Sequence, residues 1–125
     1  MDGSALCTVA VLGASPKPQR FSPQAVARLR EHRFRVVPIH PRAAQVAGVP
    51  AVASLQDLEV PVDTVTLYLG PARLAPLADD LLALAPRRVI FNPGTASPQV
   101  EERLQAAGIE CVHGCTLVML DQGRF

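Results

Sequence analysis

The sequence lacks the features that mark membrane, secreted and nucleic-acid-binding proteins. No apolar run approaches the roughly 18 residues that a bilayer-spanning helix needs, and the chain does not open with a basic segment followed by an apolar core. We therefore expect neither a membrane span nor a secretory signal. The formal net charge is +1, which argues against nucleic acid or an anionic membrane surface as the main partner. These absences favour a cytoplasmic protein whose ligand is a small molecule.

Cysteine is equally scarce. Cys7, Cys111 and Cys115 are an odd number at wide spacings, which is not typical of a disulfide framework and suits a reducing compartment. Even with His113 they are too few ligands to predict a zinc site, so no metal is expected. About half of the 125 residues are apolar, which is enough for one core, and we expect residues 1–125 to form a single domain.

The most informative stretch consists of an apolar run, a basic loop and a helix start. Residues 9–12 are continuously apolar, as in a strand that is buried on both faces. Gly13 then permits a tight turn, and Ser22-Pro23 is typical of a helix N-cap and first helical position. A helix that begins there points free N–H groups at the loop, where Lys17 and Arg20 add positive charge. The stretch predicts a phosphate or nucleotide loop, although Gly13 is also compatible with a turn that binds nothing.

Apolar periodicity and turn residues divide the rest of the chain into alternating strands and helices. The weakly patterned segment 43–53 is interpreted as a loop, and residues 54–57 have the form of a capping box, which predicts a short helical turn. His32-Arg33 stands where a glycine usually ends a helix, so a non-glycine residue can take a positive φ there at some cost. Residues 115–125 fit either a short helix or an added strand. The predicted strands are 8–12, 35–40, 63–69, 88–91 and 109–112, and the predicted helices are 23–32, 72–84 and 98–107.

Strands that alternate with helices at this period predict an α/β fold, with a doubly wound parallel sheet of about five strands between two helical layers. Right-handed crossovers place the carboxyl end of every strand at one edge of such a sheet, which is where ligands bind. Segments rich in glycine, proline or polar residues follow four of the strands, namely 13–15, 40–42, 68–71 and 92–95. Their convergence at this edge predicts the ligand site.

The residues alone leave two nucleotides open. An NAD site requires G-x-G-x-x-G after the first strand and an acidic residue at the end of the second, and neither is present. The second strand ends instead in His40, Pro41 and Arg42, and a cation there favours a phosphate on the ribose over free hydroxyls. NADP and the 3′-phosphorylated ADP of coenzyme A both satisfy this pattern, while Arg42 is also compatible with a solvated surface position.

Several motifs together resemble a known family. They are V-x-G-A-S-x-x-P-x-R-x-S from Val11 to Ser22, V-P-I-x-P from Val37 to Pro41, S-L-x-D-L from Ser54 to Leu58, and F-N-P-G-T from Phe91 to Thr95. From about residue 8 to residue 125 the chain is similar to the small stand-alone CoA-binding proteins. These in turn are similar to the CoA-binding domain of the succinyl-CoA synthetase alpha subunit. The resemblance implies a Rossmann-like fold and coenzyme A as the ligand.

The resemblance also implies roles for individual residues. The loop after the first strand would meet the diphosphate, and Pro41 and Arg42 would lie beside the ribose 3′-phosphate and the adenine. Tyr68 and Leu69 would flank the adenine or the pantetheine arm, and the turn after the fourth strand would line the far end of that arm. His40 stands where many relatives have asparagine. The residues expected to bind the cofactor are Gly13, Ala14, Ser15, Lys17, Arg20, Ser22, His40, Pro41, Arg42, Tyr68, Leu69, Asn92, Pro93 and Gly94.

The resemblance does not bring ligase activity, because the phosphorylated histidine of the synthetase lies in a later domain. His113 is the one acid–base candidate, but it has no evident acidic partner nearby in the sequence, so we expect no catalytic residue. We expect non-catalytic binding of coenzyme A or an acyl-CoA, with a partner enzyme or a second copy as possible protein partners. The alternatives are an NADP-binding oxidoreductase-like protein and a redox protein that forms a mixed disulfide with CoA at Cys115. Cys115 also suits a buried position as a small apolar side chain.

Overall fold

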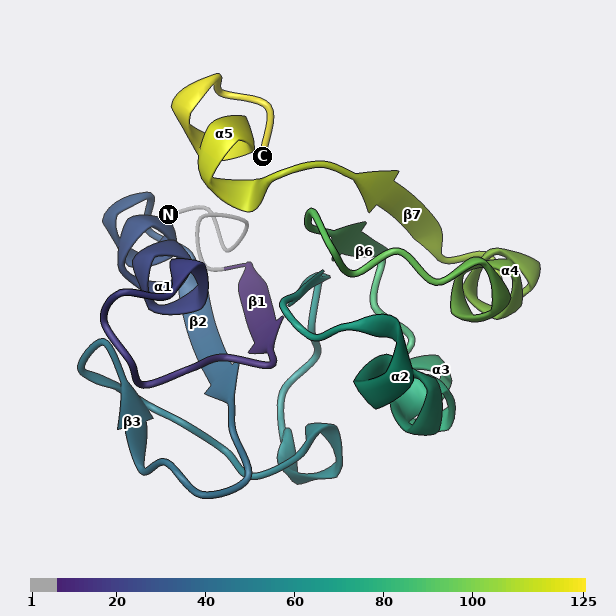
Figure 1. Cartoon of the computed structure of the whole chain (residues 1–125), viewed down its shortest axis with the longest axis horizontal. Coiled ribbons are helices and arrows are strands. Elements are labelled where there is room, and N and C mark those ends of the chain that lie inside the picture. The colour runs from purple at the N-terminus through teal and green to yellow at the C-terminus, as the bar shows by residue number, and fades with distance from the viewer. Residues whose placement is uncertain (1–6) are drawn as a thin grey trace.

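The computed structural model describes residues 7–125, which contain a five-stranded parallel sheet (Figure 1). In chain order its strands are β1 (Thr8–Leu12), β2 (Arg35–Ile39), β5 (Thr64–Leu67), β6 (Arg88–Phe91) and β7 (Glu110–His113). Their order across the sheet is β2-β1-β5-β6-β7, and all neighbouring pairs are parallel. The predicted α/β fold with a doubly wound parallel sheet is therefore confirmed, and the strand order reverses between β1 and β5.

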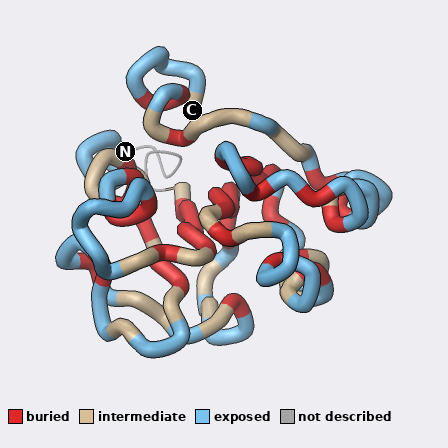
Figure 2. The backbone as a smooth tube through the Cα atoms, viewed as in Figure 1, coloured by how far each residue is buried: buried red, intermediate tan, exposed pale blue. Residues whose placement is uncertain are grey.

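Helices cover both faces of the sheet. α1 (Phe21–Glu31) and α5 (Thr116–Asp121) lie on one face, and α2 (Pro71–Leu74), α3 (Ala78–Leu84) and α4 (Pro98–Ala106) lie on the other. Because side chains alternate along a strand, Val9 and Val11 of β1 join the core under α1, while Ala10 and Leu12 join the core under α3 and α4. Figure 2 shows the buried residues concentrated in the central strands, which explains their continuous apolar runs.

α1 begins two residues earlier than the sequence predicts. Arg20 is its N-cap, and Ser22 lies within the first turn, so the predicted N-cap role of Ser22 is wrong. Pro23 is tolerated in this turn because the first N–H groups of a helix have no acceptor within it. After the helix, Arg33 has a φ of 70°, so a non-glycine residue takes the left-handed backbone at this helix end.

The predicted helix 72–84 is broken into three pieces. A 3₁₀ turn (Ala75–Leu77) separates α2 from α3, because Pro76 has no N–H to donate and interrupts the helical hydrogen bonds. By contrast, α4 begins as the sequence predicts, since the Ser97 Oγ accepts a hydrogen bond from the N–H of Val100 at 3.4 Å. A proline inside a predicted helix thus interrupts the helix, whereas a proline at the first helical position leaves it intact.

The segment predicted as a loop, 43–53, contains a short antiparallel hairpin. β3 (Gln45–Val46) pairs with β4 (Val49–Pro50), and both turn residues, Ala47 and Gly48, have positive φ. Leu55–Asp57 forms the predicted short turn, here a 3₁₀ turn, in which the Ser54 hydroxyl donates to the Asp57 carboxylate at 3.3 Å. The tail takes the helical alternative, as α5.

Candidate functional site

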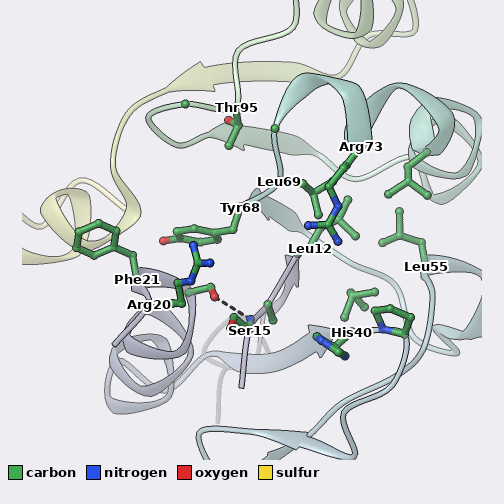
Figure 3. A pocket seen from close by; sticks show the side chains of 18 of the residues that line it. Leu12, Ser15, Arg20, Phe21, His40, Leu55, Tyr68, Leu69, Arg73 and Thr95 are labelled. Carbon is green, nitrogen blue, oxygen red and sulfur yellow. Dashed lines mark hydrogen bonds between the residues drawn. The ribbon is translucent and has the colours of Figure 1, made fainter. Parts of the chain in front are cut away.

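A cleft of about 580 Å³ opens at the carboxyl edge of the sheet (Figure 3). Its walls come from the ends of β1, β2 and β5, the start of α1, the first turn of α2, and the turn after β6. The structure brings twelve of the predicted site residues to its lining: Gly13, Ala14, Ser15, Lys17, Arg20, Ser22, His40, Pro41, Tyr68, Leu69, Pro93 and Gly94. It does not bring Arg42 or Asn92 to the lining.

The loop after β1 is tightly constrained. Gly13 has a φ of 85°, and a Cβ on this residue would lie 2.3 Å from the Leu69 Cδ2 and 3.0 Å from the carbonyl carbon of Tyr68. Glycine is therefore required for its backbone angle and for its closeness to the chain after β5. The N–H of Ser15 donates to the buried Ser22 Oγ at 2.8 Å, so Ser22 fastens the loop to α1. No side chain caps the start of α1, which leaves its first N–H groups available to an anion.

Three cationic side chains line the cleft and no carboxylate does. Lys17 and Arg20 belong to the loop before α1, and Arg73 belongs to α2. Figure 3 shows the Arg20 and Arg73 guanidinium groups entering the cleft from opposite sides. Within residues 7–125, none of the three side chains takes part in an ion pair or a hydrogen bond. The cleft therefore has a positive lining whose charges are left for a ligand.

His40 is held in one orientation by the backbone that follows it. Its Nδ1 accepts hydrogen bonds from the N–H of Arg42 at 3.0 Å and from the N–H of Ala43 at 2.8 Å. The proton of the neutral ring must then be on Nε2, so His40 lines the cleft as a hydrogen-bond donor. The exposed side chain of Arg42 does not line the cleft, and this residue contributes through its backbone.

Tyr68 contributes an aromatic side chain to the lining (Figure 3). Its hydroxyl is buried and has no hydrogen-bond partner among the described residues. Burial raises the pKa of Tyr68 to about 12, so this phenol is neutral and is a poor base at physiological pH. The side chain can supply an apolar face and one buried donor.

Asn92 supports the cleft from beneath. It is buried, and its side-chain N–H₂ donates to the Thr66 Oγ1 at 2.6 Å and to the Leu67 carbonyl at 2.8 Å. Its side-chain oxygen accepts the N–H of Thr116 at 2.8 Å, and its carbonyl accepts the Thr95 hydroxyl at 2.7 Å. Asn92 thus joins β5, β6, the start of α5 and the turn that lines the cleft, and its side chain is already fully used.

The family described as "CoA binding domain" matches this sequence over residues 7–121. The chain belongs to this CoA-binding family. The resemblance stated from the motifs is therefore confirmed, and the cleft described above is at the edge where an α/β sheet binds ligands.

Several other proteins are similar to this member of the CoA-binding family. It is 35% identical to a protein of Thermus thermophilus, cell-free ID.343, with a TM-score of 0.88 and coverage of 98% of this chain and 92% of the other. The uncharacterised protein YneT of Bacillus subtilis (strain 168) is 28% identical over 74 residues, which are 59% of this chain and 55% of YneT, so the match spans about half of that relative. A dinucleotide-forming acetyl-coenzyme A synthetase of Ca. Korarchaeum cryptofilum, in complex with phosphate and ADP, shares the fold at 21% identity. Its TM-score is 0.70, and the match covers 83% of this chain and 25% of the synthetase.

Sequence reasoning missed several residues that line the cleft. The most important is Arg73, which lies three residues after Gly70, within a segment that the sequence assigns to a single helix. The position of α2 at the carboxyl edge makes this exposed arginine a cleft residue. The other lining residues that were missed are Leu12, Phe21, Ile39, Ala53, Ser54, Leu55 and Leu77. Gly70 and Thr95 also line the cleft, and they lie in two of the segments predicted to converge there.

The two side chains considered for chemistry lie outside the cleft lining. The His113 Nε2 lies 2.8 Å from the Glu101 Oε1, and its ring stacks on Phe91 with centroids 5.1 Å apart. Glu101 is twelve residues away from His113, so no local pattern in the sequence indicates this partner. Cys115 is a half-buried free thiol at the N-cap of α5. Among residues 7–125 no three potential ligands gather around a metal position, and no helix has the length and hydropathy that crossing a bilayer requires.

Proposed function

We propose that this protein binds coenzyme A or an acyl-CoA in the cleft and does not catalyse a reaction on it. The observation that carries the proposal is the composition of the cleft, in which Lys17, Arg20 and Arg73 have no internal partner and no carboxylate is present. An elongated ligand with several phosphate charges complements this lining. Membership of the CoA-binding family supports coenzyme A as that ligand.

The geometry supports an extended placement of the ligand along the cleft. The loop 13–20 and the uncapped start of α1 would hold the diphosphate, with Lys17 and Arg20 as counter-charges. The apolar wall formed by residues such as Leu55 and Leu77 would take the adenine. Tyr68 and the turn 93–95 would line the pantetheine arm at the other end.

The side chains that line the cleft do not assemble acid–base machinery. The Tyr68 hydroxyl is neutral at physiological pH, the His40 Nδ1 is occupied by two backbone N–H groups, and no carboxylate is present to act as a base. Cys115 lies outside the lining, so no observation favours a mixed disulfide with CoA over simple binding. These features support a protein that holds the cofactor for another enzyme or senses its concentration.

Titration calorimetry with coenzyme A, acetyl-CoA, NADP and NAD tests the proposal. We expect binding of coenzyme A and acetyl-CoA, and no measurable binding of NAD, which lacks the additional phosphate on the adenosine ribose. Acetyl-CoA incubated with the protein should remain intact by mass spectrometry. Binding of NADP without binding of either CoA form, or turnover of acetyl-CoA, would contradict the proposal.

A further inference from the structure

The cations of the cleft are divided between two places. Lys17 and Arg20 flank the loop that leads into α1, whereas Arg73 projects from α2, after β5, on the opposite side of the cleft (Figure 3). Arg73 lines the cleft together with the apolar residues Leu12 and Leu69, and His40 lines the same cleft from the end of β2. The cleft therefore offers cations at two separate places, which suits a ligand that carries more than one anionic group.

We propose that Arg73, assisted by the Nε2–H of His40, binds the phosphate on the ribose and makes the protein prefer coenzyme A to dephospho-CoA. This inference rests on the proposed function, because it assigns one group of the same ligand. The ribose phosphate is a monoester with a charge near −2, and each phosphorus of the diphosphate carries about one charge. The most highly charged group of the ligand thus meets a cation that serves no other group in the described chain.

The chemistry of the two side chains suits a phosphate monoester. The guanidinium of Arg73 presents paired N–H donors that match two phosphate oxygens. His40 can supply one further donor, and only at Nε2, because its Nδ1 accepts the N–H groups of residues 42 and 43. The apolar side chains of Leu55 and Leu77 line the same cleft and would take the adenine of the same nucleoside.

Arg42 is the competing candidate, because it follows β2 directly in the sequence. Its side chain is exposed and does not line the cleft, and its backbone N–H is already used to orient His40. Replacing the Arg42 side chain leaves that backbone hydrogen bond in place. Arg42 is therefore a matched control of the same residue type near the same end of the cleft.

The test measures affinities for coenzyme A and dephospho-CoA in the wild type and in Arg73→Met, Arg42→Met and Arg30→Met. Arg30 lies on α1, is exposed and does not line the cleft, so its variant controls for the change in net charge. We expect the wild type to bind coenzyme A about 10- to 100-fold more tightly than dephospho-CoA, as charge-assisted hydrogen bonds would give. Arg73→Met should lose most of this preference with an unchanged affinity for dephospho-CoA, and the other two variants should keep it. Thermal unfolding of each variant checks that its fold is intact.

The possible failures are distinguishable. If the wild type binds both forms equally, or if Arg73→Met weakens both forms to the same extent, the inference is wrong while the proposed function stands. If Arg42→Met alone loses the preference, the phosphate belongs to Arg42 and the inference is again wrong. If the wild type binds neither form, the proposed function itself fails. Adenosine 3′,5′-bisphosphate is a second probe, and it should lose affinity in Arg73→Met more than ADP does.

Discussion

The charged residues differ between the amino edge of the sheet, where the strands begin, and the carboxyl edge, where the strands end. At the amino edge, Asp63 accepts hydrogen bonds from the Nε and Nη2 of Arg87 at 2.9 and 3.1 Å, and the buried Arg88 donates to the Thr64 Oγ1 at 2.9 Å. The Arg88 guanidinium also lies 4.5 Å from the centre of the Phe125 ring. At the carboxyl edge, the cations that line the cleft have no such partner among residues 7–125.

The comparison distinguishes charged side chains that stabilise the fold from charged side chains that can bind a ligand. A paired arginine at the amino edge stabilises the folded chain, although an exposed pair contributes only about 0.2–1 kcal/mol. An unpaired arginine at the carboxyl edge contributes little to folding, and its charge remains free to act on an anion. Substitutions at the two edges should therefore affect different measurements.

Gly13→Ala should disrupt the carboxyl edge most severely. The left-handed backbone at this position costs a non-glycine residue about 1–2 kcal/mol, and the contact of the new Cβ with Leu69 adds a packing cost of about 1–3 kcal/mol. We expect the free energy of unfolding to fall by about 3 kcal/mol and the affinity for coenzyme A to fall about 100-fold or more. Chemical denaturation and calorimetry measure the two effects.

Gly70→Ala is the matched control for Gly13→Ala. Gly70 also lines the cleft, but its φ is −70°, and a Cβ there would meet no atom within 4 Å. This variant should retain both its stability and its affinity. A similar loss in both variants would mean that the constraint on the Gly13 backbone is not the cause.

Asn92→Ala should lower stability without lowering the affinity for coenzyme A, although Asn92 lies at the carboxyl edge. Its removal leaves the Thr116 N–H and the Leu67 carbonyl without partners in a buried place, which should lower the free energy of unfolding by about 3 kcal/mol. Thr116→Val removes only the 2.7 Å hydrogen bond to Thr66 and should cost about 1 kcal/mol. Affinity for coenzyme A in the folded fraction should change by less than about threefold in both variants. A larger loss of affinity than of stability would indicate that Asn92 touches the ligand.

Arg20→Met and Asp63→Asn should give opposite results. Arg20→Met should lower the affinity for coenzyme A about tenfold. Its free energy of unfolding should stay within about 0.5 kcal/mol of the wild-type value, because this arginine has no partner among the described residues. Asp63→Asn should leave the affinity unchanged and lower the free energy of unfolding by about 1 kcal/mol, because Arg87 loses the negative charge and one of its two acceptor oxygens. If both variants lose stability to the same extent, the contrast between the two edges does not hold.

The dependence of stability on acid pH should depend on the Asp63–Arg87 pair at the amino edge. The hydrogen bonds from Arg87 lower the pKa of Asp63 from its usual 3.8. A lowered folded-state pKa means that its contribution is fully present above pH 3.8 and is lost as pH falls through the folded-state value. The wild type should therefore lose stability more steeply than Asp63→Asn below about pH 4, as measured by urea unfolding. Parallel curves for the two proteins would refute this role of Asp63.

Alkaline titration should measure the ionisation of Tyr68, which lies at the carboxyl edge. Tyr68 is the sole tyrosine and the chain has no tryptophan, so ultraviolet absorbance follows this one phenol. Burial raises its pKa to about 12, and the stability that this shift contributes is lost between about pH 10 and pH 12. We expect a midpoint near 12 for the folded protein and near 10 in denaturant. A midpoint near 10 in the folded state would mean that the hydroxyl is accessible to solvent.

Sequence patterns alone are sufficient to predict the fold class, the family and twelve of the residues that line the cleft. Buried strands appear as continuous apolar runs because both of their faces are covered, and parallel topology then requires the segments after them to share one edge. Local signals of this kind located the loop at Gly13 and the helix start at Ser97. They also located His40, although only the folded chain shows that its Nδ1 accepts two backbone N–H groups.

Tertiary structure decided which polar residues line the cleft. Ser22 has the sequence pattern of an N-cap, but α1 begins at Phe21 and the Ser22 hydroxyl accepts the N–H of Ser15 instead. Asn92 and Arg42 stand in segments that end at the cleft, yet one is buried beneath it and the other is turned out to solvent. Arg73 carries no local signal and still enters the cleft. The direction of a side chain depends on neighbours far away in the sequence, so a pattern of nearby residues cannot determine it.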